Sequence, residues 1–301
     1  MATQFDIAGG KFAIAPTAAA DAKAVRMLMP ELRDAAAAFV AVDLTHGLVI
    51  GAAAATRLTR RQPLVGPGVA VHVIEPCRGH GIGTALVGHL ETAARRAGAA
   101  ALYAARRALQ ESNEMCGWTS LGFTPCESVQ EHTLPLERFE PQLSPLLDRM
   151  RERGRIPPAA RIIPLFQANL PAVLQLHLDH LGGNRGELYR KLRGDGAGAF
   201  HPRYSRVLVV GDKTLGCILA HRRDQETAVV DADIVDPTLR GGWANVWLKL
   251  EATRGAMRLG IKQFQFTSFD HYSDTRSFST KLGGAVQQTT VLMMRRIGTD
   301  I

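Results

Sequence analysis

The segment Arg78-Gly79-His80-Gly81-Ile82-Gly83, which we call the cradle, carries three glycines at alternate positions. It follows an apolar run, Val69 to Ile74, and precedes a helix-like run, Thr84 to Ala97. Glycine adopts positive φ values and has no Cβ to obstruct a ligand. Successive N–H groups at the start of a helix attract anions, most often phosphate. The cradle therefore predicts a phosphate-binding turn between a strand and a helix.

The spacing in the cradle excludes two common phosphate sites. An ATP-binding P-loop requires Lys before a Ser or Thr, so that an ammonium reaches the terminal phosphates. Here Gly83 is followed directly by Thr84. A dinucleotide site requires an acidic residue about 20 positions further on, which holds a ribose. No acidic residue lies between Glu91 and Glu111.

The Arg-x-x-Gly-x-Gly pattern of the cradle resembles the signature of the GNAT N-acyltransferases. A second similarity lies at Leu121-Gly122-Phe123-Thr124-Pro125. In that family the loop after the fourth strand wraps the pyrophosphate of acetyl-CoA, which is a co-substrate, and no metal is used. A glycine-rich turn without function is the alternative. The resemblance implies the following cofactor-binding residues: Val73, Arg78, Gly79, His80, Gly81, Ile82, Gly83, Thr84 and Asn113.

Two residues beside the cradle could deprotonate an attacking amine. Alternation along a strand places His72 on the side opposite Val71 and Val73. The resemblance implies that this is the substrate side, and a neutral imidazole accepts protons near neutral pH. A structural, hydrogen-bonded histidine is the alternative. Glu75, in the turn before the cradle, is the second candidate base.

The sequence departs from the family at the general acid. The position that often holds a catalytic tyrosine is Trp118, and an indole N–H does not protonate a thiolate. Tyr103, on the preceding predicted strand, is a candidate substitute. A thiolate is weakly basic, so departure without an acid is also tolerable.

The chain contains an internal repeat. Arg78-Gly79 recurs as Arg240-Gly241, 162 residues later, and Gly98 recurs as Gly260 at the same offset. Leu121-Gly122 recurs as Leu282-Gly283, 161 residues later. This constant register indicates duplication.

We expect an α/β fold with two tandem GNAT-like domains, each a mixed sheet with helices on both faces. The predicted domains are residues 1–140 and 161–301, joined by a linker helix within 141–160. Predicted strands at Ser128 to Leu134 and Val286 to Met294 close the first and the second copy.

The second copy has a degenerate cradle. Trp243 and Asn245 stand where the first copy has Gly81 and Gly83. A Trp side chain there either fills the pyrophosphate space or packs into the core of its own domain. We expect the first domain to be the catalytic one. Asp231 and Asp233 share one face of a predicted strand, where they either bind a cationic substrate or serve a structural role.

Composition narrows the class of protein. The net charge is +8, from 36 basic and 28 acidic residues. The basic residues are dispersed without a nucleic-acid motif, which disfavours nucleic acid as a partner. The four cysteines form no C-x-x-C pair, so neither a zinc site nor a disulfide framework is indicated. No apolar run reaches the roughly 18 residues of a membrane span, and we expect a cytoplasmic protein.

The expected function is transfer of an acetyl group from acetyl-CoA to an amine by direct attack. The acceptor is a small-molecule or a peptide amine. The alternative is a non-catalytic acyl-CoA-binding regulator or scaffold. The acceptor's identity, the preferred acyl chain and the oligomeric state are left open.

Overall fold

The computed structural model describes residues 3–7, 10–29, 35–60, 64–270 and 273–298. The chain divides into two compact units. Unit 1 comprises Met1–Ser128 and Thr289–Ile301, and unit 2 comprises Val129–Gln288. These boundaries differ from the sequence division, because the last residues of the chain join the first unit.

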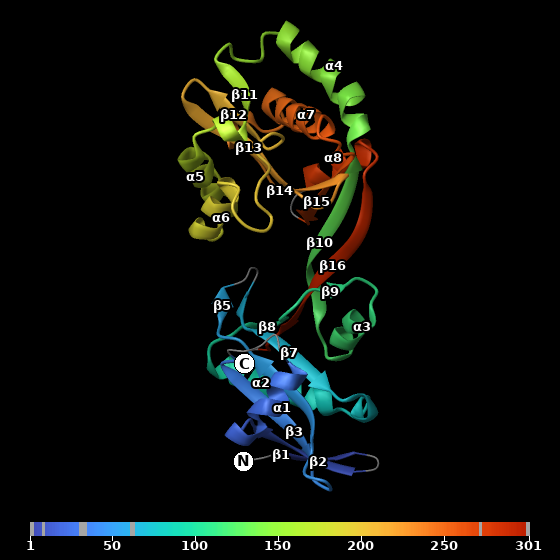
Figure 1. The fold of residues 1–301 in the computed structure, drawn as a ribbon. Helices are drawn as coiled ribbons and strands as arrows, with labels where there is room; N and C mark the ends of the chain where they lie inside the picture. The colour runs from blue at the N-terminus through green and yellow to red at the C-terminus, as the bar shows by residue number, and fades with distance from the viewer. Residues whose placement is uncertain (1–2, 8–9, 30–34, 61–63, 271–272, 299–301) are drawn as a thin grey trace. The chain divides into compact units, whose positions relative to one another are not determined.

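Unit 1 is built on a mixed sheet in the order β1-β2-β3-β4-β7-β8-β16, followed by β10. Its helices are α1 (Ala22–Leu28), α2 (Ile82–Arg96) and α3 (Asn113–Ser120) (Figure 1). Its strands are β1 (Thr3–Ile7), β2 (Gly10–Pro16), β3 (Ala37–Asp43), β4 (Val49–Ala55), β5 (Thr59–Arg60), β6 (Val65–Gly66), β7 (Gly68–Val73), β8 (Ala101–Ala104) and β9 (Ala108–Leu109), with parts of β10 (Thr124–Pro135) and β16 (Ala285–Arg296). The strands and helices expected around the cradle are thus present.

Two apolar layers hold the sheet of unit 1. Helix α2 presents Ile82, Leu86 and Leu90 at the three- and four-residue spacing of an amphipathic helix, and all three are fully buried in a core with Val69 of β7. The opposite face carries a smaller cluster that includes Ala70 and residues next to and within α1. Neighbouring residues of β7 therefore face different helices, as strand alternation requires.

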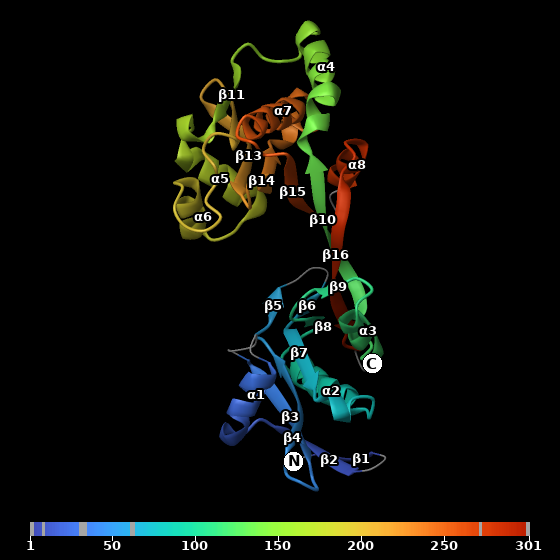
Figure 2. The ribbon, with the colours of Figure 1, turned by 45° about the vertical axis from the view of Figure 1, so that its right-hand side comes forward.

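Unit 2 repeats this order with strands β15-β14-β13-β12-β11, and β10 lies beyond β15. Its helices are α4 (Phe139–Glu152), α5 (Leu170–Leu181), α6 (Arg185–Leu192), α7 (Trp243–Met257) and α8 (Ser273–Lys281) (Figure 2). Its strands are β11 (Ala160–Pro164), β12 (Arg206–Val210), β13 (Lys213–Arg222), β14 (Thr227–Val235) and β15 (Gln263–Phe269). Each unit contains one parallel pair, which is β7 with β8 in unit 1 and β14 with β15 in unit 2. The fold is therefore α/β, with two units that share one strand order.

The expected linker helix belongs to the core of unit 2. Helix α4 runs over fourteen residues, with Pro145 inside it. Phe139, Leu143 and Leu147 recur every fourth position and are buried against α7 and the sheet. The burial of this face outweighs the one backbone hydrogen bond that Pro145 removes.

The closing strands are exchanged between the two copies. Strand β16 ends the second copy in sequence, yet Met294 and Arg295 pair with Tyr103 and Leu102 of β8 in unit 1. Strand β10 ends the first copy, yet its residues from Val129 onward pair with β15 in unit 2. The expectation that each copy closes its own sheet is therefore wrong. Each sheet is completed by a strand from the other copy.

A buried histidine makes unit 2 sensitive to acid. His132 of β10 is 3% exposed, and its two ring nitrogens contact the hydroxyls of Ser268 (2.9 Å) and Ser279 (3.2 Å). Burial, and after it the charge of Arg276, hold the pKa of His132 below its ordinary value. The unfolded chain therefore binds a proton at a higher pH than the folded chain does.

We expect unit 2 to lose stability as the pH falls through about 6.5, by up to about 1.4 kcal/mol per pH unit from this residue alone. Above that pH both states are neutral, and His132 contributes no slope. Melting temperatures measured from pH 7.5 to 5.5 should show a shallower fall in His132→Gln. His80→Gln changes an exposed ring and serves as the control. An unchanged slope in His132→Gln would contradict the assignment.

Candidate active site

The cradle presents open backbone donors at the start of α2. Gly79 and Gly81 have φ values of +79° and +78°. The first intrahelical hydrogen bond runs from Ala85 N–H to Gly81 O, so the N–H groups of residues 82–84 precede the helical ladder. Gly81 is the N-cap residue, and its position provides no side-chain cap. Three donors and the positive end of the helix dipole therefore converge on one exposed point.

The three glycines of the cradle are required for two different structural reasons. The left-handed conformation at Gly79 and Gly81 is strained for a residue with a Cβ. Open space surrounds both, because an added Cβ would meet nothing within 4 Å. At Gly83 an added Cβ would lie 3.2 Å from Leu121 Cδ2. The first two glycines thus shape a free surface, and the third allows α2 to pack against the turn after α3.

Arg78 holds the cradle to the end of β7. Its Nε donates to the carbonyl of Val73 at 2.9 Å, and the residue is exposed. Arg240 makes the corresponding contact with Val235 O, at 3.4 Å, in unit 2. The arginine that both copies share therefore fixes the loop geometry through a backbone carbonyl.

Strands β7 and β8 separate beside the cradle. Their ladder among the described residues has two pairs, Gly68 with Tyr103 and Val69 with Ala104. The other edge of β7 stays paired with β4 as far as Val73. Ile74 N–H bonds to β4 and Val69 O accepts from Ala105. By alternation, the N–H groups of Val71 and Val73 point into the opening next to β8.

The candidate bases lie at this opening. His72 is half-buried on β7, on the face it shares with Ala70, opposite α2. This is the placement expected from alternation. Glu75 is exposed at the first residue of the short 3₁₀ helix that follows β7. Both residues flank the splayed strand end.

Tyr103 is not placed to act as an acid. It is fully buried, and its hydroxyl donates to Leu64 O (2.8 Å) and accepts from Leu64 N–H (3.2 Å). A phenol enclosed in this way cannot reach a departing thiolate, so the catalytic assignment of Tyr103 is corrected to a structural one. Trp118 is also buried, in edge contact with Phe123.

The remaining residues predicted to bind the cofactor lie partly on the surface and partly in the core. His80, Thr84 and Asn113 are exposed, and Asn113 begins α3. Ile82 is 1% exposed and anchors α2 in the core, so only its backbone faces the cradle opening. The Val71 N–H group was missed from the sequence. No local signal shows where the pairing between two parallel strands stops.

The corresponding loop of unit 2 has a different shape. Gly241 is left-handed (φ +68°), but Gly242 is extended, and Trp243 already belongs to helix α7. Trp243 is 8% exposed and packs in the core of unit 2. Of the two readings for this residue, the structure shows the second, packing into its own domain. The loop has one left-handed residue where the cradle has two.

Asp231 and Asp233 do not share a face. The β13–β14 register shifts by one residue between Leu219 and Ala220, and a bulge of this kind reverses the alternation beyond it. Asp231 therefore faces Lys191 and His221, whereas Asp233 pairs with Lys249 of α7.

Within residues 3–298, apart from the gaps given above, no group of three or more His, Cys, Asp and Glu side chains is arranged to hold a metal. Within the same ranges, every helix is too short or too polar to cross a membrane.

The chain is similar to known proteins both in sequence and in fold. The acetyltransferase (GNAT) family model matches residues 13–122. A comparison with curated proteins gives no match.

Several solved structures share the fold. The GCN5-related glucosamine N-acetyltransferase region of a fungal multi-domain GH3 β-N-acetylglucosaminidase aligns with a TM-score of 0.56 at 12% identity, and covers 96% of this chain. This chain spans only 38% of that protein. A GCN5-related N-acetyltransferase from Sphaerobacter thermophilus gives 0.52 at 15% identity, with 96% and 97% of the two chains covered. One from Anabaena variabilis gives 0.54 at 11% identity, with 95% and 73% covered. At these identities the likeness is one of fold.

The matched segment contains β7, the cradle, α2 and β8. It thus includes the open N–H groups and the separated ends of β7 and β8. Residues 13–122 are therefore similar in sequence to the acetyltransferase (GNAT) family, and the whole chain is similar to such proteins in fold.

Proposed function

We propose that unit 1 transfers an acyl group, in the simplest case acetyl, from acyl-CoA to an amine by direct attack. The observation that carries this proposal is the pairing of the cradle with the splayed end of β7. A diphosphate fits three convergent N–H groups at a helix start. An amide-containing arm fits a strand edge whose own partner has turned away.

Acyl-CoA supplies the thioester that makes the acyl group reactive. The chain's own contribution begins with the amine, which is protonated at neutral pH because its ordinary pKa is about 10.4. His72 is the proposed base, acting directly or through water, with Glu75 as the second candidate. The N–H groups of Val71 and Val73 are the proposed donors to the developing oxyanion.

The leaving thiolate requires no acid in this scheme. Tyr103 and Trp118, the two aromatic candidates, are both enclosed in the core. A thiol has an ordinary pKa of about 8.5 and departs far more readily than an alkoxide. The same observation favours one alternative, in which unit 1 binds acyl-CoA without turnover and acts as a regulator or scaffold.

Unit 2 is proposed to be non-catalytic, since its loop lacks the second left-handed residue. The proposed acceptor is an amine of a small molecule or a peptide, and the loops that select it differ among proteins of one fold.

Release of free thiol from acetyl-CoA, measured across a panel of amines, tests the proposal. With an accepted amine, we expect His72→Gln to lower kcat by about a hundredfold with little change in the KM for acetyl-CoA, because a general base acts in the chemical step. Tyr103→Phe is the control. Loss of its hydroxyl contacts lowers stability, while kcat is retained.

Two results would count against this function. Tight acetyl-CoA binding without thiol release for any amine supports the regulator instead. An unchanged kcat in His72→Gln would remove His72 from the mechanism and leave Glu75 to be tested next.

A further inference from the structure

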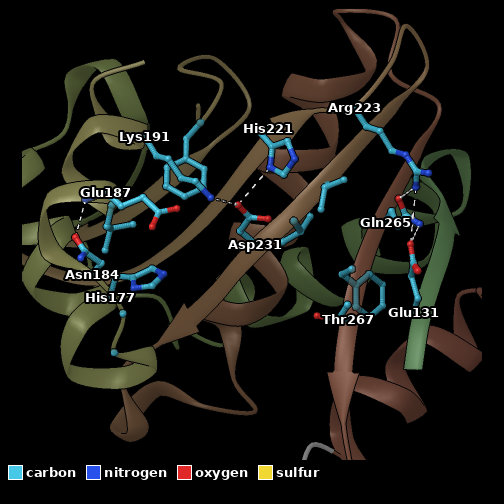
Figure 3. A pocket seen from close by; sticks show the side chains of 17 residues that line it. Glu131, His177, Asn184, Glu187, Lys191, His221, Arg223, Asp231, Gln265 and Thr267 are labelled. Atoms are coloured by element: carbon cyan, nitrogen blue, oxygen red, sulfur yellow. Dashed lines mark hydrogen bonds and ion pairs between the residues drawn. The ribbon is translucent and has the colours of Figure 1, made fainter. Parts of the chain in front are cut away.

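Unit 2 contains a cavity of about 730 Å³ between helices α5 and α6 and the strands β13, β14 and β15. Figure 3 shows Lys191, His221 and Asp231 pointing toward one another on one side, with Arg223, Gln265 and Glu131 as a second group on the other side. Asp231 lies on β14 at the bulge, and the β14–β15 ladder ends one residue earlier, at Val230 and Phe266. The cavity thus occupies the place where the two parallel strands separate. Its walls come from segments far apart in the chain, so local patterns pointed to Asp231 and not to the cavity around it.

Asp231 is the central anion of this cavity. Its Oδ2 lies 3.6 Å from Lys191 Nζ and 3.3 Å from His221 Nδ1, and its side chain is 25% exposed. The lysine distance exceeds that of a hydrogen bond. The carboxylate of Asp231 can therefore still accept hydrogen bonds from a ligand. The ammonium group of Lys191 beside it is an example of the cationic group that this carboxylate attracts.

One imidazole lines the cavity with an unused polar atom. Among the described residues, the buried Nδ1 of His177 has no hydrogen-bond partner, whereas Nδ1 of His221 lies against Asp231. Burial lowers the pKa of His177, so its ring stays neutral at pH 7 and offers one acceptor nitrogen. A buried polar atom without a partner is costly, and a ligand with N–H donors would satisfy it.

The charge balance of the lining favours a cation. Three carboxylates (Asp231, Glu187 and Glu131) stand against two cations (Lys191 and Arg223). Arg223 forms an ion pair with Glu131 (3.8 Å), and both contact Gln265, so these two charges cancel at the far side. Asp231 and Glu187 then remain against Lys191. Phe200, Phe266 and Val230 supply apolar wall between the polar groups.

We propose that this cavity binds a small alkylammonium ligand, with Asp231 as its anchor. A primary ammonium group has three N–H donors, which match the carboxylate of Asp231 and the unpartnered Nδ1 of His177. The alkyl part lies against the apolar wall. The site makes unit 2 an amine-binding module, and its occupancy does not depend on acyl transfer in unit 1.

Ligand-observed NMR titration of the full chain with butylammonium tests the site, with 1-butanol and butyrate as isosteric neutral and anionic probes. We expect butylammonium alone to bind. Asp231→Asn should weaken it about tenfold or more, because a charged hydrogen bond is lost. The matched control is Asp233→Asn, two residues away on β14 and paired with Lys249 on the opposite face. Lys191→Met should bind at least as tightly as the wild type, because it removes a competing cation.

The outcomes separate this site from unit 1. His72→Gln should leave the titration unchanged, so loss of turnover and loss of this binding are independent results. Equal binding of 1-butanol, unchanged affinity in a folded Asp231→Asn, or equal weakening in Asp233→Asn would overturn the proposal. Binding of butyrate that is lost in Lys191→Met would show an anion site instead. Far-ultraviolet circular dichroism of each variant confirms that it is folded.

Discussion

Gly81→Val is expected to abolish tight acetyl-CoA binding while the chain stays folded. A residue with a Cβ at φ +78° is strained by about 1–2 kcal/mol. The loop therefore relaxes, or the side chain projects into the space in front of the N–H groups. Loss of hydrogen bonds to a charged ligand adds about 1.5–3 kcal/mol each. Together these effects predict an increase in Kd of about a hundredfold or more, measured by calorimetry.

The repeat provides a matched control for this change. Gly241 in unit 2 is also left-handed (φ +68°), and an added Cβ there also meets nothing within 4 Å. Gly241→Val imposes the same kind of strain without touching the cradle. We expect wild-type affinity for acetyl-CoA in Gly241→Val. Equal losses in both variants would mean that strain alone, or binding at unit 2, accounts for the effect.

Met293→Asp is expected to unfold unit 1, although Met293 lies near the end of the second copy. Met293 is fully buried in one core with Ile82, Leu86 and Val69. Loss of a buried Met side chain costs about 2–5 kcal/mol, and an unpaired buried carboxylate adds several more. Loss of acetyl-CoA binding should accompany the loss of structure, because α2 carries the cradle on the same core.

Val286 provides the control on the same strand. It lies seven residues earlier in β16, in unit 2, and is 49% exposed. We expect Val286→Asp to melt as the wild type does, followed by circular dichroism. If Met293→Asp left unit 1 intact and impaired only unit 2, the strand exchange would be contradicted. Arg295 offers a milder probe, since it joins β16 to Glu91 of α2 (2.8 Å) and to Leu121 O (2.8 Å).

Local chemistry made the cradle predictable. Gly79 and Gly81 stand where the backbone adopts positive φ, and the adjoining apolar runs became β7 and α2 within a residue or two at each end. Alternation along β7 also placed His72 correctly on the face opposite α2. These features depend on residues close together in sequence, whose conformational preferences are strong.

Two other predictions were wrong because contacts with distant residues determine the role or the orientation of the side chain. Tyr103 was a candidate acid because it has a hydroxyl on the right strand. Its bonds to Leu64, thirty-nine residues away, make it structural. Asp231 and Asp233 were expected on one face, and the bulge opposite Leu219 and Ala220 separates them. Neither a bulge nor a distant hydrogen-bond partner can be recognised from the alternation of polar and apolar residues along a strand.

The sequence by itself predicted the glycine-rich turn between β7 and α2, the internal repeat and the main strands and helices around each loop. Only the tertiary structure decided which strand completes which sheet. Strands β10 and β16 both contain 12 residues, and the backbone of either could satisfy the hydrogen bonds at the open edge of β8 or β15. Their pairing depends on the path of the chain in three dimensions. Hydrophobic periodicity predicts helices and strands, but it does not predict which strands pair. The cradle of unit 1 therefore rests on a core that the last residues of the chain complete.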